Sequence, residues 1–501
     1  YTIIIGSMGS GKSMQMNNEL FESVLAAGLD RIPYIFITDV GMTSSGLVFG
    51  IQNALDTSRK NLCVYRRISR TKRDAINPLE TAVGLQHPLS NEFAEMKSFL
   101  VTLVTPSELD RPEAEVSNVI SLILKETFDF FATDNDQAQP KLYQIGQSTE
   151  LDFLLRELRI NIDMSKQLRL HDLALLCHQR AESILERDTA SQQRKNKLYR
   201  ARNLAHRYAM PILADCIAVT KFDTVKRIYG NYKLSNGDYI LDAIARAMSQ
   251  VAIDYPNFNN YTEFDISDAR IASVDLQDVI VKNNPKNNSL FFQIIRMFYK
   301  KRIAYSEEDL QRGEIPDTYL EYYSRLVAEL KVDRKYMVFD EMHNIKSDQT
   351  MLAELERDSR EARKWGIAYY LSSQYISDFG LLVKAARRFV VCSSGSPEER
   401  KEIVQALSLT PAQVSRLTTA VGLRPTGMTY LSKVINKQGN EFVQFLTSMV
   451  GSKRLWLLTT DPDDQAVRSI LRKRYDLDTV INMLAMIHPR GVKSIIQVKK
   501  E

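Results

Sequence analysis

Short runs of apolar, often β-branched residues alternate along most of the chain with longer segments of helical spacing. The apolar runs predict buried strands at residues 2–5, 34–40, 62–68, 270–276, 335–339, 367–372, 388–392, 442–447 and 455–459. Apolar residues that recur every three or four positions predict helices at residues 14–26, 289–304, 316–330, 348–364, 397–407, 463–475 and 477–487. This alternation favours an α/β fold whose mostly parallel sheet is covered by helices on both faces.

The middle of the chain has a different pattern. Residues 106–265 contain segments of helical spacing, rich in Arg, Lys and Gln, at 151–170, 173–187 and 198–212. A connection of this length without structure of its own is not expected inside a compact domain. We therefore predict an all-helical domain at 106–265, inserted between two parts of an α/β core at 1–105 and 266–501.

The composition is that of an ordinary globular protein. The chain has 501 residues, 44% of them hydrophobic, and a formal net charge of +5, which is too small to indicate a nucleic-acid partner. No apolar run approaches the ~18 residues that a membrane span needs. The four cysteines are widely scattered, which favours reduced thiols in a cytosolic compartment over disulfides or a zinc site. Because the chain starts at Tyr1 and enters a strand at once, we expect it to be a fragment.

The first predicted strand leads directly into a phosphate-binding loop. Gly6, Gly11, Lys12 and Ser13 match the pattern G-x-x-x-x-G-K-[ST]. Glycines allow the backbone N–H groups to point at a phosphate, and the following helix adds its N-terminal dipole. We expect Lys12 to reach the β- and γ-phosphates and Ser13 to ligate Mg²⁺. The predicted nucleotide-binding residues are Gly6, Ser7, Met8, Gly9, Ser10, Gly11, Lys12, Ser13 and Met14.

Two further strand ends carry polar residues suited to hydrolysis. Asp340 and Glu341 follow the apolar run at 335–339, where Asp340 would lie beside Mg²⁺ and Glu341 would act as general base toward water. Gln374 follows the next strand and can hydrogen-bond both the γ-phosphate and the attacking water. His343 is interpreted as a loop or capping residue, with a catalytic role as the alternative. In this interpretation Asp340 is the Walker B aspartate and 335–339 is the Walker B strand. A second acid directly after that aspartate, followed by a strand with a polar end, is typical of ATPases that have an added strand between the phosphate-loop strand and the Walker B strand.

Basic residues form a face on the helix between these two strands. Arg360, Arg363 and Lys364 are three or four positions apart and so share a side of the helix. The face is either simply solvated or supplies an arginine to the γ-phosphate of a neighbouring subunit. Arg387 and Arg388 are weaker candidates for that role. Asp39, at the end of the second strand, either touches the site or caps the next turn.

The order of these motifs resembles that of the large ATPase of type IV secretion systems, which belongs to the HerA–FtsK group of motors. The resemblance rests on residues 6–13, 38–41, 76–79, 338–341, 360–366 and 372–374, and it spans 1–105 and 266–480. Within that family the sequence is most similar to the DotO (IcmB) branch of the type IVB, or Dot/Icm, apparatus, as its C-terminal ATPase half. No base-reading N-K-x-D motif is evident, which favours ATP over GTP.

The resemblance implies a RecA-like P-loop core, ATP and Mg²⁺ as ligands, and a homohexamer with ATP between subunits. It places the protein in the cytoplasm, attached peripherally to the bacterial inner membrane through a secretion complex. It also implies secreted protein substrates and a second, DotB-like secretion ATPase as partners, and the roles given above to Lys12, Ser13, Asp340, Glu341 and Gln374. Arg360 or Arg363 stands where the family carries its basic motif. Nucleic acid is not indicated.

Two other functions remain open from the sequence. The first is a double-stranded DNA translocase of the same superfamily, which would need basic loops lining a ring. The second is an assembly scaffold that binds ATP with little turnover.

Overall fold

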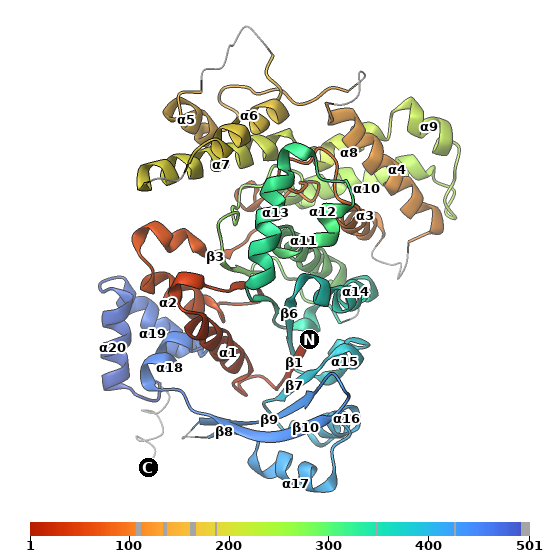
Figure 1. Ribbon diagram of the computed structural model, residues 1–501. Helices are drawn as coiled ribbons and strands as arrows, with labels where there is room; N and C mark the ends of the chain where they lie inside the picture. Colours follow the sequence, from red (N-terminus) through yellow and green to blue (C-terminus); the bar gives the residue numbers. More distant parts are fainter. Residues whose placement is uncertain are drawn as a thin grey trace. The chain divides into compact units, whose positions relative to one another are not determined.

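The computed structural model describes residues 1–106, 112–133, 138–160, 167–185, 188–346, 348–424 and 427–491. The chain divides into two compact units. The first, here the sheet unit, consists of Tyr1–Ile68, Ile266–Ser306 and Ala328–Glu501. The second, here the helical unit, consists of Ser69–Asp265 and Glu307–Val327. The protein is thus a mixed α/β protein with a mostly parallel sheet and many helices (Figure 1).

All ten strands of the described residues belong to one sheet. Its order is β10-β9-β7-β1-β6-β5-β2-β4-β3, with β8 paired to β9. Strands β1 to β7 pair in parallel, whereas β8, β9 and β10 pair antiparallel. The strands are β1 Thr2–Ile5, β2 Tyr34–Asp39, β3 Cys63–Arg67, β4 Ile271–Asp275, β5 Lys335–Phe339, β6 Ile367–Ser373, β7 Arg388–Val391, β8 Gly422–Arg424, β9 Gly427–Ile435 and β10 Glu441–Ser448.

The phosphate-loop strand β1 lies inside the sheet between β6 and β7. Strand β6 separates β1 from β5, the strand that ends at Asp340, as the sequence predicts. Strand β1 is almost completely buried, which explains its run of isoleucines. In this arrangement the carboxyl ends of β1, β6 and β5 meet at the same edge of the sheet.

Helices complete the sheet unit. They are α1 Lys12–Ala27, α2 Ser45–Ala54, α11 Pro285–Ile303, α14 Gln349–Trp365, α15 Leu382–Ala385, α16 Pro397–Leu407, α17 Pro411–Ala420, α18 Ser452–Leu458, α19 Pro462–Arg472 and α20 Leu477–Ile487. Side chains of α1 and α2 pack with β1, β2 and β9 in one hydrophobic core, which includes Ile4, Met16, Leu20, Leu47 and Met428. This core holds the phosphate loop between β1 and α1.

One expectation about strands needs correction. The strand predicted at 455–459 is wrong, because residues 455–458 lie in helix α18 and Thr459 follows the end of that helix. Trp456 packs against α20 while Leu458 joins the core beneath the sheet, so this short apolar run is buried on two sides as a helix. Periodicity cannot separate a buried helix from a buried strand over so few residues. Strands β8 and β9 were not predicted.

The helical unit begins earlier than residue 106 and also includes a later segment. It contains α3 Ser90–Val104, α4 Ala114–Phe131, α5 Thr149–Glu157, α6 Leu170–Glu182, α7 Thr189–Ala209, α8 Leu213–Val219, α9 Asp223–Tyr229, α10 Ile240–Asp254, α12 Glu307–Gln311 and most of α13 Asp317–Val332. The later segment belongs here because Tyr319 stacks on His178 and Tyr323 donates a hydrogen bond to the Val83 carbonyl. Of the predicted helices at 151–170 and 173–187, residues 161–166 and 186–187 lie outside the described residues.

Cysteine and membrane expectations can be compared with the structure. Cys63, Cys177, Cys216 and Cys392 are all buried and none forms a disulfide. Among the described residues no group of three or more His, Cys, Asp or Glu side chains is placed to hold a metal ion by itself. Within the same residues, no helix combines the length and the apolar character that crossing a bilayer requires.

Candidate functional site

The loop between β1 and α1 needs glycine at several positions. Gly9 and Gly11 have φ angles of 74° and 86°, in the left-handed region that favours glycine. A Cβ atom on Gly6 would lie only 2.3 Å from the Ser10 hydroxyl oxygen. That hydroxyl is buried and has no hydrogen-bond partner among the described residues. A tight turn at a helix N-terminus with an unsatisfied buried hydroxyl fits a bound phosphate group.

Lys12 connects this loop to the end of β5. Its Nζ lies 2.9 Å from Glu341 Oε1 and 3.6 Å from Asp340 Oδ1, and the residue is only 5% exposed. Burial disfavours the charged ammonium, but the two carboxylates outweigh that effect and hold the pKa of Lys12 above its usual value. The lysine is therefore a fixed positive charge at the carboxyl edge of the sheet.

Ser13 and Asp340 place two oxygen ligands side by side. Ser13 Oγ donates a hydrogen bond to Asp340 Oδ2 at 3.0 Å. Asp340 is fully buried, and its own backbone N–H donates to the Thr38 carbonyl of β2 at 2.9 Å, so its position is set by the sheet. A hydroxyl and a carboxylate are oxygen donors of the kind that Mg²⁺ accepts when the remaining ligands are water and phosphate. The residues present therefore fit the ion.

Glu341 follows immediately, in a left-handed backbone conformation with φ 55°. Its Oε2 lies 2.9 Å from His343 Nδ1, and Oε1 accepts from Lys12. Burial alone would raise the pKa of Glu341, but the contacts with His343 and Lys12 lower it to about 2. Glu341 is thus an ionised carboxylate at neutral pH, and His343 contacts it although the sequence pattern favoured a loop or capping residue.

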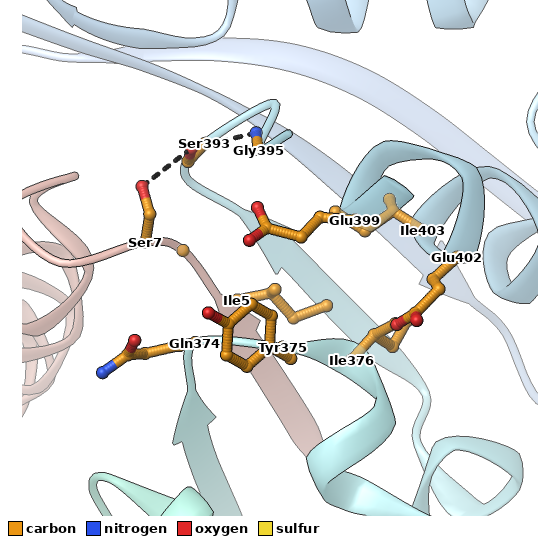
Figure 2. A pocket seen from close by; sticks show the side chains of 11 residues that line it. Ile5, Ser7, Gln374, Tyr375, Ile376, Ser393, Gly395, Glu399, Glu402 and Ile403 are labelled. Carbon is orange, nitrogen blue, oxygen red and sulfur yellow. Dashed lines mark hydrogen bonds between the residues drawn. The ribbon is translucent and has the colours of Figure 1, made fainter. Parts of the chain in front are cut away.

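Gln374 lies at the end of β6, next to the loop. It lines a small pocket with Ser7, Ser393, Glu399 and Glu402, and Figure 2 shows Gln374 and Ser7 on one side and the two glutamates on the other. The pocket volume is about 10 Å³, enough for about one water molecule. The preceding Ser373 donates to Asp378 Oδ2 at 2.6 Å, which anchors the strand end that carries Gln374.

The two predicted arginines lie on the solvent side of α14. Arg360 pairs with Glu356 at 2.7 Å and its side chain is 76% exposed, and Arg363 is exposed as well. Among the described residues neither contacts Lys12, Asp340 or Glu341 of its own chain. The structure thus brings Lys12, Ser13, Asp340 and Glu341 into contact, whereas Arg360 and Arg363 lie on an exposed face of α14.

The contacts of two other residues bear on their open alternatives. Asp39 is fully buried and accepts hydrogen bonds from Thr43 Oγ1, at 2.7 Å, and from the Ser44 backbone N–H, at 2.8 Å, so it caps the turn after β2. Burial, together with the nearby Asp340, raises the pKa of Asp39 to about 7. Arg388 forms two hydrogen bonds with Glu19, at 2.6 and 2.7 Å, and is thereby held within its own chain.

Sequence reasoning missed one side of the site. A Cβ atom on Gly11 would lie 2.8 Å from the Met428 sulfur and 3.1 Å from Leu423 Cδ2, so β8 and β9 reach the phosphate loop. The sequence signal for β9 is the alternation of apolar and polar residues around Met428 and Tyr430. Its pairing with β7 in the structure identifies this segment as a strand.

Comparisons with known proteins find similarity at the level of structure. The sequence matches no protein-family model and no curated protein. The solved structure of VirB4 of Thermoanaerobacter pseudethanolicus is similar over 90% of this chain and 89% of that chain, with 13% sequence identity and a TM-score of 0.46. The function is therefore argued below from the chain's own motifs and contacts.

Proposed function

We propose that this chain is an ATP-hydrolysing motor of a bacterial type IV secretion system, of the IVB or Dot/Icm type. The observation that carries the enzymatic part is the contact of Lys12 and Ser13 with Glu341 and Asp340. These residues come from distant parts of the sequence and meet at one edge of the sheet. The order of motifs in the sequence supports the assignment to secretion.

In this proposal the loop residues 6–14 bind the triphosphate and Lys12 neutralises its β- and γ-phosphates. Ser13 and Asp340 would hold Mg²⁺, which when bound shields phosphate charge and orients the γ-phosphate. Gln374 positions a water, and Glu341 accepts the proton of that water as it attacks the γ-phosphorus and ADP leaves. Lys12 must first exchange its contact with Glu341 for phosphate oxygens, which frees that carboxylate to act as base.

The helical unit is, in this proposal, an insertion in a RecA-like core, and the chain works as a homohexamer. Its partners would be components of an inner-membrane complex, a DotB-like second ATPase and secreted proteins. The protein would then be cytoplasmic and peripherally attached to the inner membrane.

The variant Glu341→Gln tests the hydrolytic role. It keeps the shape of the side chain but removes the base, so turnover should fall by about 10²–10⁴-fold while ATP binding persists. Calorimetric ATP binding and phosphate release measure the two effects. Glu398→Gln, which changes an exposed carboxylate of α16 that does not line the pocket, is the control and should keep turnover. Undiminished turnover in Glu341→Gln would contradict the proposal.

The exposed arginines are proposed to act on the neighbouring subunit's nucleotide, because their own chain leaves them without a contact to the site. Arg363→Ala and Arg360→Ala should each lower turnover, and mixing either with Lys12→Ala should restore part of it. In a mixed ring some sites combine an intact loop with an intact arginine. Absence of restoration in assemblies that still form would show that the arginines do not act in trans.

Duplex DNA separates the secretion motor from a DNA translocase of the same superfamily. Strong, salt-sensitive stimulation of turnover by DNA would favour the translocase.

A further inference from the structure

We propose that the base of the bound nucleotide packs on an apolar surface formed by Leu423 and Met428, here called the base platform. The inference rests on the proposed function. It adds the position of the nucleoside and the expectation that the protein discriminates only weakly between nucleotide bases. It concerns the side of the phosphate loop that is opposite to the catalytic carboxylates.

The sheet order gives the direction of the nucleotide. Lys12, Asp340 and Glu341 mark the γ-phosphate end, and the two carboxylates belong to the end of β5, on the β6 side of β1. The triphosphate follows the loop from that end toward the first turn of α1. The nucleoside therefore extends to the other side of β1, where β7 and β9 lie and where β8 pairs with the edge of β9 opposite to β10.

Leu423 and Met428 lie directly against the loop on that side. Both would contact a Cβ atom on Gly11, at 3.1 Å from Leu423 Cδ2 and 2.8 Å from the Met428 sulfur. The two residues are cross-strand partners in β8 and β9. Figure 1 shows these strands at the end of the sheet that α1 approaches.

The two residues differ in exposure. Met428 is only 6% exposed and belongs to the hydrophobic core of the sheet, whereas Leu423 is 59% exposed. Met428 thus forms the floor of the surface, and Leu423 leaves a large apolar side chain uncovered beside the phosphate-binding loop.

The chemistry of the platform suits the flat face of a purine. Leucine and methionine offer apolar contact, and a thioether packs favourably against an aromatic ring. The guanidinium of the adjacent Arg424 donates to the carbonyls of Thr419 and Ala420 in α17, so it is turned toward that helix. Apolar contact discriminates poorly between bases that differ only in polar groups. ATP and GTP should therefore bind with affinities within about tenfold of each other.

The test compares a nucleotide with a triphosphate that has no nucleoside. The dissociation constants of ATP and of inorganic tripolyphosphate, each with Mg²⁺, are measured calorimetrically for the wild-type protein and for Leu423→Ala. Leu423 is exposed, so its truncation should leave the fold intact. We expect the affinity for ATP to fall by about 5- to 20-fold, since burial of a leucine side chain against the base is lost, and that for tripolyphosphate to stay the same.

Phe442→Ala is the matched control. Phe442 is also exposed, at 55%, and lies in the same hairpin, but it is six residues, or about 20 Å, along β10 from Ser448, the cross-strand partner of Met428. It should leave both affinities unchanged. Leu423→Met, which keeps an apolar side chain, should retain most of the affinity for ATP.

Three outcomes would overturn the inference. Equal losses for ATP and tripolyphosphate in Leu423→Ala would mean that Leu423 supports the loop and not the base. Unchanged ATP affinity in Leu423→Ala would mean that the base lies elsewhere. A wild-type protein that binds neither ligand would instead overturn the proposed function itself.

Discussion

The two sides of the phosphate-loop strand are built from opposite kinds of contact. Toward β6 and β5, the buried Lys12 and Asp340 and the partly buried Glu341 are paired through the lysine. Toward β9 and β8, Leu423 is exposed and apolar. Charges can be buried only when they are paired, whereas exposed apolar side chains are tolerated. The side proposed for catalysis therefore pairs its charges within the chain, and the side proposed for the nucleoside leaves apolar surface to be covered.

A second layer of paired charges stabilises the catalytic side. Arg296 of α11 forms two hydrogen bonds with Asp358 of α14, at 2.6 and 2.7 Å, and one with Glu354 at 2.9 Å. Lys300 also donates to Asp358, and so does Tyr369 of β6. The network joins α14, whose outer face carries Arg360 and Arg363, to the strand that ends near Gln374.

The largest expected effect comes from removing the charge at the centre of the catalytic side. Lys12→Ala should reduce turnover by at least about a thousandfold, because a preorganised positive charge on the phosphates is lost. It should also leave two neighbouring carboxylates without their cation. Phosphate release measures the loss, with Lys384→Ala, an exposed lysine of α15, as control. Turnover within tenfold of wild type would show that Lys12 does not bind the phosphates.

A smaller effect is expected from the second layer. Asp358→Ala leaves Arg296 and Lys300 buried with too few carboxylates, and the free energy of unfolding should fall by about 3 kcal/mol. Urea unfolding followed by circular dichroism measures it. Glu356→Ala, which breaks the exposed pair with Arg360, should cost at most about 1 kcal/mol. Equal effects of the two variants would contradict the view that the catalytic side is held by buried charge.

The smallest expected effect comes from a change of backbone freedom at Gly11, beside the proposed nucleoside side. Gly11→Ala places a Cβ atom at a positive φ and should reduce stability by about 1–2 kcal/mol. The same atom would press on Met428 and Leu423, so we expect weaker ATP binding as well. Gly28→Ala, at the other end of α1, has a φ of 82° but meets no atom within 4 Å. Gly28→Ala should therefore lose stability without losing affinity for ATP. Weakened ATP binding in Gly28→Ala would show that the effect of Gly11→Ala does not come from Met428 and Leu423.

Much of the catalytic side was predictable because its signals are local. The phosphate loop is one continuous segment, and Asp340, Glu341 and Gln374 each stand at the end of an apolar run. The side proposed for the nucleoside was missed because Leu423 and Met428 belong to the antiparallel strands β8 and β9. These strands are recognised by their pairing with neighbouring strands, which the sequence does not show. The segment at 455–459 was misassigned for a related reason, since its burial comes from α20 and from the core below the sheet.

The amino-acid sequence alone determined that a strand, a glycine-rich turn and a helix would form a phosphate loop, because backbone angles and apolar periodicity act over a few neighbouring residues. It also indicated which strands would end in carboxylates. Only the tertiary structure decided that Asp340 and Glu341 contact Lys12 and Ser13, and that β8 and β9 flank Gly11. Those contacts join residues hundreds of positions apart, and they depend on strand order, which arises from the packing of the whole sheet.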